Sequence, residues 1–142
     1  MPGINRILET CLYVADLDAS QRFYETLFGF QPMLRDDRIC ALSVPGRGAL
    51  LLFKIGASLS PSRMPVGTIP PHGGQGNQHL CFAIDRADID AWQTRLEDAN
   101  IPTESRIDWS ENVTSLYFRD PDHHSIELGT AGLWPNDPQD DR

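Results

Sequence analysis

The chain has 142 residues, of which 40% are hydrophobic, and this suffices for one compact domain or two fused half-domains. Its 20 acidic and 12 basic residues give a formal net charge of -8, which argues against nucleic acid as a partner. No segment approaches the roughly 20 apolar residues that span a bilayer, so we expect a cytoplasmic protein with no membrane partner. Three cysteines at no metal-cluster spacing predict reduced thiols rather than disulfides.

The first predicted element is a strand that begins at Glu9. Side chains alternate between the two faces of a strand, so Glu9 and Cys11 share one face and Leu12 and Val14 form an apolar opposite face. Glu9 is a possible metal ligand. The strand therefore presents a candidate ligand on one side and a candidate core on the other.

A helix is predicted after this strand. Residues 16–20 supply N-cap candidates, Phe23 and Leu27 have the i, i+4 spacing of one helix face, and Gly29 is a typical helix-ending residue. Further strands are predicted at residues 31–35, 39–44 and 49–55. Residues 57–76 then contain four Pro, four Gly and three Ser, a composition typical of a linker or a lid-like loop.

The second half of the chain repeats this order. His79 begins a strand 70 residues after Glu9 and shares a face with Cys81. Trp92 and Leu96 have helical spacing, and Asn100 can take the left-handed position that closes a helix. The strands that follow are predicted at residues 103–109, 114–118 and 125–128. We expect Phe23 of the first helix and Trp92 of the second to be core residues.

Each half thus predicts one strand, one helix and three strands. This pattern places the protein in the α+β class, with two βαβββ modules in tandem. We place the first module at residues 1–56, the linker or lid loop at 57–76 and the second module at 77–134. A polar tail follows at residues 135–142.

Two stretches resemble a known family. They are Leu-Tyr-Val-Ala-Asp-Leu-Asp-Ala-Ser-Gln-Arg-Phe-Tyr-Glu-Thr-Leu-Phe-Gly-Phe at residues 12–30 and Leu-Tyr-Phe-Arg-Asp-Pro-Asp-His-His-Ser-Ile-Glu-Leu at residues 116–128. Over nearly its whole length the chain resembles the vicinal oxygen chelate superfamily, which includes glyoxalase I, extradiol dioxygenases and bleomycin-resistance proteins. The resemblance implies modules that curl a mixed sheet around a cleft, a divalent metal held by strand residues, and a homodimer.

The resemblance also implies where the metal ligands lie. Carried over to this chain they are Glu9, His79 and Glu127, with a fourth position near Leu52, where the sequence is wholly apolar. One imidazole and two carboxylates suit Mn, Fe(II), Ni or Zn and leave coordination positions open for water and substrate. Glu127 is at the same time a candidate catalytic residue.

Ordinary structural roles are the alternatives for these side chains. Glu9 could be a surface carboxylate, His79 a buried or rim histidine and Glu127 a solvent-facing strand residue. His123 and His124 follow Asp-Pro-Asp and are interpreted as turn residues rather than ligands.

The remaining candidates surround the expected substrate cleft. His72, in a Pro- and Gly-rich loop, could act as an acid or base near neutral pH. Cys11 and Cys81 are expected to be small buried fillers beside the site. The candidates for an aromatic cleft wall are Tyr13, Trp109 and Tyr117.

Two functions fit these residues. The first is a metal-dependent enzyme, a lyase or isomerase working through an enolate or a dioxygenase, that acts on a small oxygenated substrate. The second is a metal-free binding protein of the bleomycin-resistance type. The acidic net charge favours it, and so does Glu9, which stands where the resembled family most often has a histidine. Within the enzyme class, the apolar fourth position argues against a glutathione-dependent glyoxalase. The lack of recognisable phosphonate-contacting basic residues argues against a fosfomycin thiol transferase.

Overall fold

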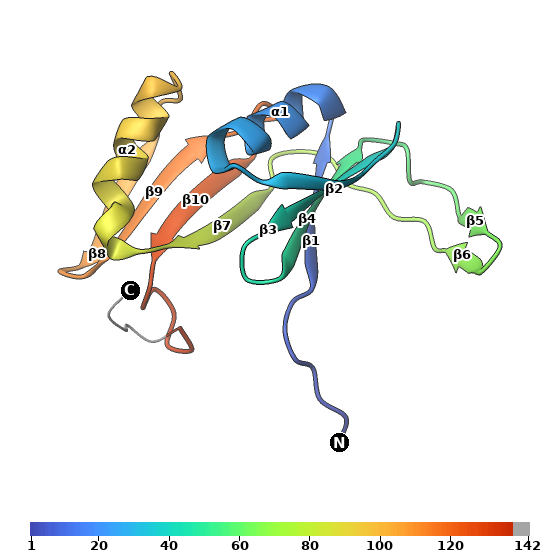
Figure 1. Ribbon diagram of the computed structural model, residues 1–142, viewed down its shortest axis with the longest axis horizontal. Coiled ribbons are helices and arrows are strands. Elements are labelled where there is room, and N and C mark those ends of the chain that lie inside the picture. Colours follow the sequence, from blue (N-terminus) through green and yellow to red (C-terminus); the bar gives the residue numbers. More distant parts are fainter. Residues whose placement is uncertain (138–142) are drawn as a thin grey trace. The chain divides into compact units, whose positions relative to one another are not determined.

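The computed structural model describes residues 1–137. The chain divides into two compact units, residues 1–76 and the residues from Asn77 onward. Each unit contains a four-stranded mixed sheet and one α-helix (Figure 1). The predicted α+β class and the two tandem βαβββ modules are therefore confirmed. Residues 138–142 of the predicted polar tail lie outside the described part of the chain.

The first unit contains the first module. Its elements are β1 (Glu9–Val14), α1 (Leu17–Phe28), β2 (Gln31–Arg35), β3 (Ile39–Val44) and β4 (Gly48–Lys54). The strand order is β1-β4-β3-β2, with β1 and β4 parallel and the other pairs antiparallel. All three strands predicted after the helix lie within one residue of their observed bounds.

The ends of α1 follow the capping signals in the sequence. Asp16 Oδ1 accepts hydrogen bonds from the backbone N–H groups of Asp18 (2.9 Å) and Ala19 (3.1 Å). Gly29 has φ 73° and donates its N–H to Glu25 O at 2.9 Å. A left-handed residue at this position favours glycine, because a side chain would be strained there.

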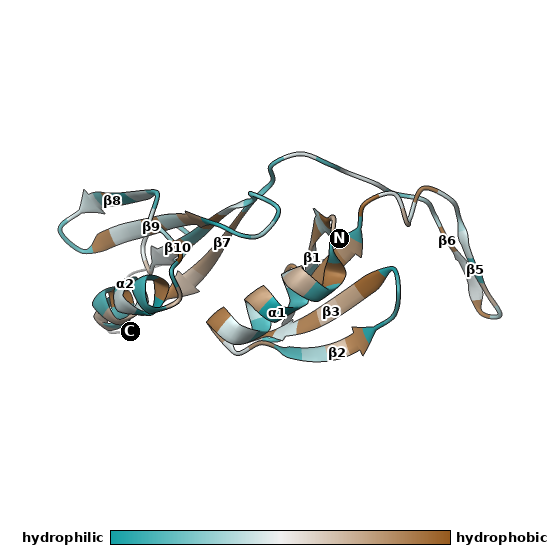
Figure 2. Ribbon diagram, turned by 90° about the horizontal axis from the view of Figure 1, so that it is seen from above, coloured by the Kyte–Doolittle hydropathy of each residue, from teal (hydrophilic) through white to brown (hydrophobic). Residues whose placement is uncertain are grey.

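One face of the first sheet is covered by α1 and forms the core of the unit (Figures 1 and 2). Leu12 and Val14 of β1 point to this face, as the alternation predicts, and Leu12 pairs in register with Leu52 of β4. These three side chains are at most 2% exposed. The opposite face, which carries Glu9 and Cys11, is not covered by α1.

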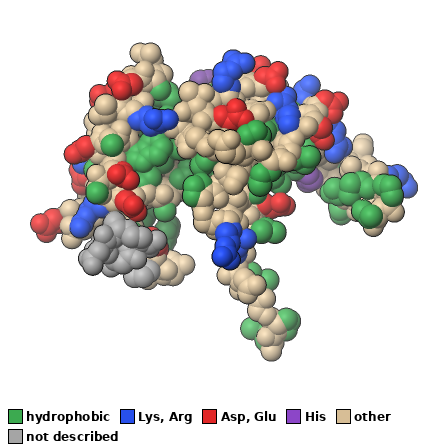
Figure 3. All heavy atoms as spheres, in the orientation of Figure 1, with side chains coloured by type: hydrophobic (Ala, Val, Ile, Leu, Met, Phe, Trp, Pro, Cys, Tyr) green, Lys and Arg blue, Asp and Glu red, His purple; other side chains and the backbone are tan. Residues whose placement is uncertain are grey.

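Residues 57–76 contain more structure than a linker. They include a two-stranded hairpin of β5 (Ser62–Met64) and β6 (Gly67–Ile69), which extends away from β1–β4 in Figures 1 and 2. The base of the hairpin is closed by a hydrogen bond from His72 N to Ser58 O (2.9 Å). Apolar side chains are exposed along it, at the right of Figure 3: Leu59, Met64, Val66 and Ile69.

The second unit repeats the topology. Its elements are β7 (His79–Ile84), the 3-10 helix η1 (Arg86–Asp88), α2 (Ile89–Asp98), β8 (Ser105–Ser110), β9 (Val113–Arg119) and β10 (Ser125–Thr130). The strand order is β7-β10-β9-β8, and only β7 and β10 are parallel. Asn100, beyond α2, has φ 57°, the predicted left-handed conformation. The fully buried apolar side chains of this unit include Leu96, Leu116, Phe118, Ile126 and Leu128.

Helix α1 buries a different aromatic residue from the one predicted, and the buried residue of α2 is Leu96. Tyr24 is fully buried, whereas Phe23 is only half-buried and meets the Tyr24 ring edge-on at 5.1 Å. Tyr24 lies on the same helix face as the buried Leu17 and Leu27, because 3.6 residues make one turn. Trp92 of α2, also predicted to be core, is half-buried. Within residues 1–137 no helix has the length and apolar composition needed to cross a bilayer.

Candidate functional site

Residues singled out in the sequence gather on one face of the second sheet. His79 and Cys81 point to the same side of β7, since they are two residues apart. Glu127 of β10 pairs in register with Cys81 on one side and with Tyr117 of β9 on the other. Directly paired residues point to the same face of a sheet, so all four side chains share it.

His79 and Glu127 meet at the centre of this face. His79 Nε2 lies 3.2 Å from Glu127 Oε2, and His79 Nδ1 lies 2.9 Å from Ser125 O. A carbonyl oxygen can only accept a hydrogen bond, so His79 Nδ1 carries a proton and donates a hydrogen bond to Ser125 O. In many proteins a hydrogen bond from the other ring nitrogen to a carbonyl oxygen orients a metal-binding histidine in this way. Nε2 of the neutral ring is then free to act as a ligand.

The spacing of the pair fits a shared cation. Lone pairs on Nε2 and Oε2 would face each other at 3.2 Å, which is unfavourable unless a proton or a metal ion lies between them. Two atoms each about 2.1 Å from one ion, at roughly a right angle, lie about 3 Å apart. His79 and Glu127 could therefore hold a divalent metal.

Glu127 is buried in an unusual way for a carboxylate. Its exposed fraction is 5%, and its Oε1 is buried without a hydrogen-bond partner of normal geometry. Burying an unsatisfied charged oxygen costs free energy, which a bound cation would offset. The His79 side chain is 54% exposed, so a ligand can reach the pair from solvent.

The environment of Glu127 keeps its neighbours protonated. Desolvation, and then the nearby Glu127 carboxylate, raise the pKa of Cys81 to about 12. Desolvation, and then a hydrogen bond to Glu127 and the charge of that carboxylate, raise the pKa of Tyr117, whose ring stacks against His79 with centroids 6.3 Å apart. The two groups beside the His79 and Glu127 pair are thus a neutral thiol and a neutral phenol.

Small and polar residues complete this face. The indole Nε1 of Trp109 donates to the hydroxyl of Ser115 at 2.9 Å, which holds the ring against the sheet. Gly129 lies two residues beyond Glu127, where a Cβ would come within 3.1 Å of Cys81 Sγ and 3.8 Å of Glu127 Oε1. The absence of a side chain at Gly129 therefore leaves room for the carboxylate and the thiol.

A second group of possible ligands lies in the turn before β10. Asp120, Asp122 and His124 each place one ligand atom within 4.8 Å of the others. Asp120 Oδ1, however, accepts from the backbone N–H groups of Asp122 and His124, both at 2.9 Å. His124 Nδ1 accepts from Gln78 N at 2.9 Å. These bonds give the cluster a turn-forming role, consistent with the interpretation of His124 as a turn residue.

The matching face of the first sheet lines a cavity of about 680 Å³. Three of the predicted residues of β1, Glu9, Cys11 and Tyr13, contribute to its wall, and His72 contributes from the segment after β6. Glu9 is exposed. Its role as a third metal ligand stays a prediction.

His72 is held inside this cavity by aromatic neighbours. Tyr13 Oη and His72 Nδ1 are 2.6 Å apart, and the His72 ring meets Phe53 edge-on with centroids 4.5 Å apart. Tyr13 is 9% exposed, and burial, followed by the neighbouring Cys11, raises its pKa. A neutral phenol donates to the imidazole nitrogen, so Nε2 of His72 then carries the ring proton.

Strand register identifies the fourth ligand position of the resemblance. Cys11 pairs with Leu51 in the first sheet, as Cys81 pairs with Glu127 in the second. The counterpart of Glu127 is therefore Leu51, which is half-buried and lines the cavity. Leu52, the position predicted to be nearest, points the other way and is fully buried in the core.

The prediction of buried cysteine fillers is wrong for both residues concerned. Cys11 and Cys81 are exposed, and Cys40 of β3 is the buried cysteine. Burial raises the pKa of Cys40. The two exposed cysteines lie on the sheet faces opposite the helices, and those faces are only partly covered within each unit.

Sequence reasoning missed several residues that shape these faces. Phe53, Leu51 and Arg38 line the first cavity, and Ser115 and Gly129 shape the second face. Alternation along residues 50–53 could have assigned Leu51 and Phe53 to one face, but it does not say which face. No local signal marks Ser115 as the partner of Trp109.

A family model and curated proteins match this chain. The model described as the Glyoxalase/Bleomycin resistance protein/Dioxygenase superfamily matches residues 3–128. Metallothiol transferase FosB of Shouchella clausii is 26% identical over 133 residues, which cover 92% of this chain and 83% of that protein. The protein of the same name from Staphylococcus epidermidis is 27% identical over 131 residues, covering 92% of this chain and 84% of that protein.

Solved structures match as well. The lactoylglutathione lyase from Agrobacterium tumefaciens is 37% identical, with a TM-score of 0.85, covering 94% of this chain and 99% of that one. The fosfomycin resistance protein FosX from Mesorhizobium loti is 22% identical, with a TM-score of 0.60, covering 94% of this chain and 95% of that one. The second likeness shows the fold alone.

Proposed function

Because the chain belongs to the glyoxalase/bleomycin resistance protein/dioxygenase superfamily, we propose that it is a metal-dependent enzyme acting on a small oxygen-bearing substrate. The observation that carries the proposal is the pair formed by His79 Nε2 and Glu127 Oε2 at 3.2 Å. The imidazole is oriented by Ser125 O, and the carboxylate has an unsatisfied buried oxygen. Two groups prepared in this way have the donor set and the spacing that a divalent ion requires.

His79 and Glu127 would hold the ion, and Glu9 would supply a third ligand. A bound ion of this kind acts as a Lewis acid on an oxygen atom of the substrate. The apolar Leu51 offers no fourth ligand, so coordination positions stay open for the substrate. The neutral Tyr117 hydroxyl and Cys81 thiol beside Glu127 would add uncharged hydrogen-bond donors.

Two non-oxidative reaction classes are favoured by the names of the relatives. Those names describe a metallothiol transferase and a lactoylglutathione lyase, and both refer to thiol chemistry. An oxygenase usually combines two histidines with one carboxylate, whereas this chain offers one histidine and two carboxylates. These names count against the sequence-based arguments that disfavoured a glutathione-dependent glyoxalase and a fosfomycin thiol transferase, and we favour a lyase, isomerase or thiol transferase over a dioxygenase. Assays of hemithioacetal isomerisation and of thiol transfer to fosfomycin, each with added metal, separate these classes.

The test of metal dependence is a titration of the full chain after dialysis against EDTA. Mn²⁺, Co²⁺ and Zn²⁺ would be added in turn, with heat and bound metal measured. We expect one ion per chain, and a loss of affinity of about a hundredfold or more in His79→Ala and Glu127→Gln. Glu111→Gln, which changes an exposed carboxylate of the same unit, is the control. Equal affinity in all of these proteins would refute the proposed function.

A metal-free binding protein is the second candidate. The cavity of the first unit favours it, because about 680 Å³ lies within the range of small-molecule sites. Such a protein would bind its ligand equally well after EDTA treatment and would show no turnover with any metal. The metal titration thus separates the two candidates.

We also propose a homodimer. Strand β2 is an edge of the first sheet and is exposed along its whole length, with Met33 58% and Leu34 54% exposed. Unpaired edges and exposed apolar side chains favour association. Light scattering at micromolar concentration should give about twice the chain mass of 15.9 kDa. A mass near that of one chain would contradict the dimer.

A further inference from the structure

The cavity of the first unit has a floor suited to a flat apolar ring. Tyr13 and Phe53 pair in register on β1 and β4, and their rings stack with centroids 6.0 Å apart. Leu51 lies beside them, and Ile69 and Pro70 line the cavity from the segment at the end of β6. Stacking and burial against aromatic side chains favour an aromatic ligand over a small polar one.

Arg38 brings a positive charge to this cavity, whose lining also includes the carboxylates of Glu9 and Asp36. It lies in the turn between β2 and β3, where Asp36 Oδ1 accepts from Arg38 N (2.7 Å) and Ile39 N (2.9 Å) and so fixes the backbone. Among the residues that line the cavity, Arg38 alone is an Arg or Lys. Within residues 1–137 its guanidinium makes only a long contact of 3.5 Å, to Ser62 Oγ. It is half-buried, so a charge-assisted bond formed there is not fully screened by water.

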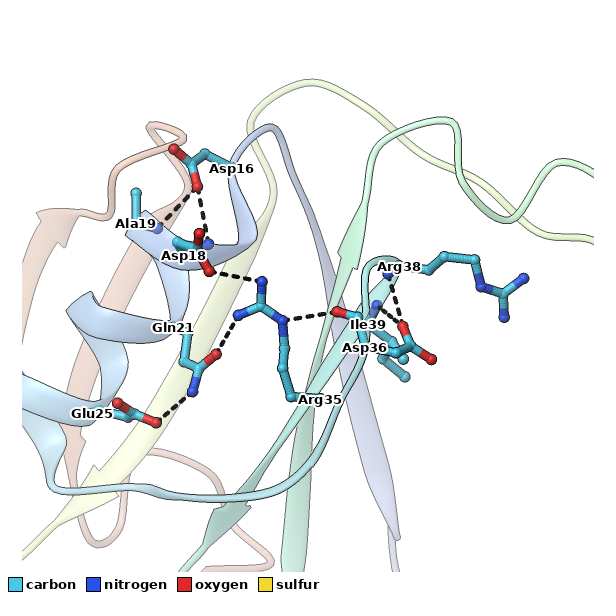
Figure 4. Close-up of polar contacts among 9 residues, drawn as sticks. All are labelled: Asp16, Asp18, Ala19, Gln21, Glu25, Arg35, Asp36, Arg38 and Ile39. Carbon is cyan, nitrogen blue, oxygen red and sulfur yellow. Dashed lines mark hydrogen bonds and ion pairs between the residues drawn. The ribbon is translucent and has the colours of Figure 1, made fainter.

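The guanidinium of the nearby Arg35, in contrast, has several hydrogen-bond partners. Arg35 donates to the Asp18 carboxylate at 2.8 Å, to Gln21 Oε1 and to Asp36 O (Figure 4). Arg38, in the same view, points away from this network and from the Asp36 carboxylate. Arg35 is therefore occupied in holding β2 to α1, and Arg38 is available to a ligand.

The Tyr13 and His72 pair adds a positioned donor. Its 2.6 Å hydrogen bond occupies His72 Nδ1, and the ring is fixed by Phe53 and by the bond from His72 N to Ser58 O. Nε2 carries the remaining proton when Tyr13 is the donor. The cavity thus combines an aromatic floor, a guanidinium and a rigid imidazole N–H.

We propose that the cavity of the first unit binds a small aromatic carboxylate. The ring of the ligand lies against Tyr13 and Phe53, its carboxylate contacts Arg38, and His72 Nε2 donates to one of its oxygens. Binding by this cavity does not require a metal at His79 and Glu127. Only the further statement that such a ligand is the substrate rests on the proposed function.

The test uses the full chain after EDTA treatment and two probes of similar shape, 2-naphthoate and the neutral 2-naphthamide. Calorimetry should show that wild type binds 2-naphthoate more tightly. Arg38→Gln should lower the affinity for 2-naphthoate by about tenfold or more, because the carboxylate loses its contact with the guanidinium. It should leave the affinity for 2-naphthamide within about twofold of wild type. Arg38→Lys should keep part of the preference, since it retains the charge but loses the planar fork.

Arg35→Gln is the matched control, because it removes the same charge three residues away. Its affinity for each of the two probes should stay within about twofold of the wild-type value. Glu127→Gln, which should lose metal, should bind 2-naphthoate like wild type, and this separates the inference from the proposed function. Equal affinity for the two probes, equal weakening by Arg35→Gln and Arg38→Gln, or no binding of 2-naphthoate at millimolar concentration would overturn the proposal.

Discussion

The two sheets of this protein share a topology but differ at equivalent positions of their helix-free faces. Cys11 pairs with Leu51 in the first sheet, where the second pairs Cys81 with Glu127. Two residues further along each strand, Tyr13 pairs with Phe53. The corresponding pair in the second sheet is Ala83 with Gly129.

These differences give each face its own chemistry. In the first sheet, large aromatic side chains form the floor of a cavity of about 680 Å³. In the second, small residues leave space around a buried carboxylate and its histidine. The fold requires only that the helix-covered face stay apolar, so the other face is free to diverge between the repeats.

The largest effect should follow when the second face is given the residue of the first. In Glu127→Leu we expect metal binding to be abolished and the metal-free protein to become more stable by about 1–4 kcal/mol, because a buried, partly unsatisfied carboxylate is removed. Calorimetry in EDTA should show Tm higher by several degrees. The control Glu111→Leu, at an exposed site, should have a free energy of unfolding within about 0.5 kcal/mol of the wild-type value. A marked fall in Tm for Glu127→Leu would show that the ion pair itself stabilises the fold.

A new ligand beside Glu9 on the first sheet tests whether Glu9 belongs to the metal site. Leu51→His places an imidazole on β4 beside Glu9, at the position that Glu127 occupies beside His79. If Glu9 shares the ion of His79 and Glu127, titration should give one ion per chain with affinity increased by about tenfold. Two ions per chain would show that Glu9 and the new imidazole form a separate site. An unchanged titration would remove Glu9 from the ligand set.

The Cys81 thiol reports on the charge at Glu127. Its pKa of about 12 leaves little thiolate at pH 8, so iodoacetamide should modify Cys81 far more slowly in the folded than in the unfolded chain. The carboxylate contributes to the raised pKa, and Glu127→Gln should therefore lower it and speed the folded-state reaction by roughly threefold or more. Peptide mass spectrometry measures the rate at Cys81 alone. A rate unchanged in Glu127→Gln would mean that desolvation of the thiol by the surrounding atoms accounts for the whole shift in pKa.

The smallest expected effect comes from filling the space beside Glu127. In Gly129→Ala the new Cβ would lie 3.1 Å from Cys81 Sγ and 3.2 Å from Leu133 Cδ2, so one of these neighbours must shift. We expect a loss of about 1 kcal/mol in the free energy of unfolding, measured by urea denaturation. Gly48→Ala is the control, because its Cβ would meet Val44 Cβ at an ordinary 3.7 Å. Equal stability of the two variants would show that the face is not tightly packed at Gly129.

Local signals were enough to predict the two α-helices and the strands of the two four-stranded sheets. The Asp16 cap, the Gly29 and Asn100 stops and the alternation in the strands act over a few residues, and each has the predicted conformation. The hairpin of β5 and β6 was not predicted, because its strands are three residues long and lie in a segment rich in Pro and Gly. Short strands among turn residues carry little periodicity to detect.

The sequence by itself determined that the chain is a duplicated βαβββ fold, that Glu9 and His79 begin equivalent strands, and that each shares a face with a cysteine. Those features depend on neighbours along the chain and on the period of two in a strand. Only the tertiary structure decided that Leu51, and not Leu52, is the counterpart of Glu127. It likewise brought His72 to Tyr13 across 59 residues and left Cys11 and Cys81 exposed. The physical reason is strand register, since a slip of one residue turns every side chain to the other face, and register is set by contacts between distant segments.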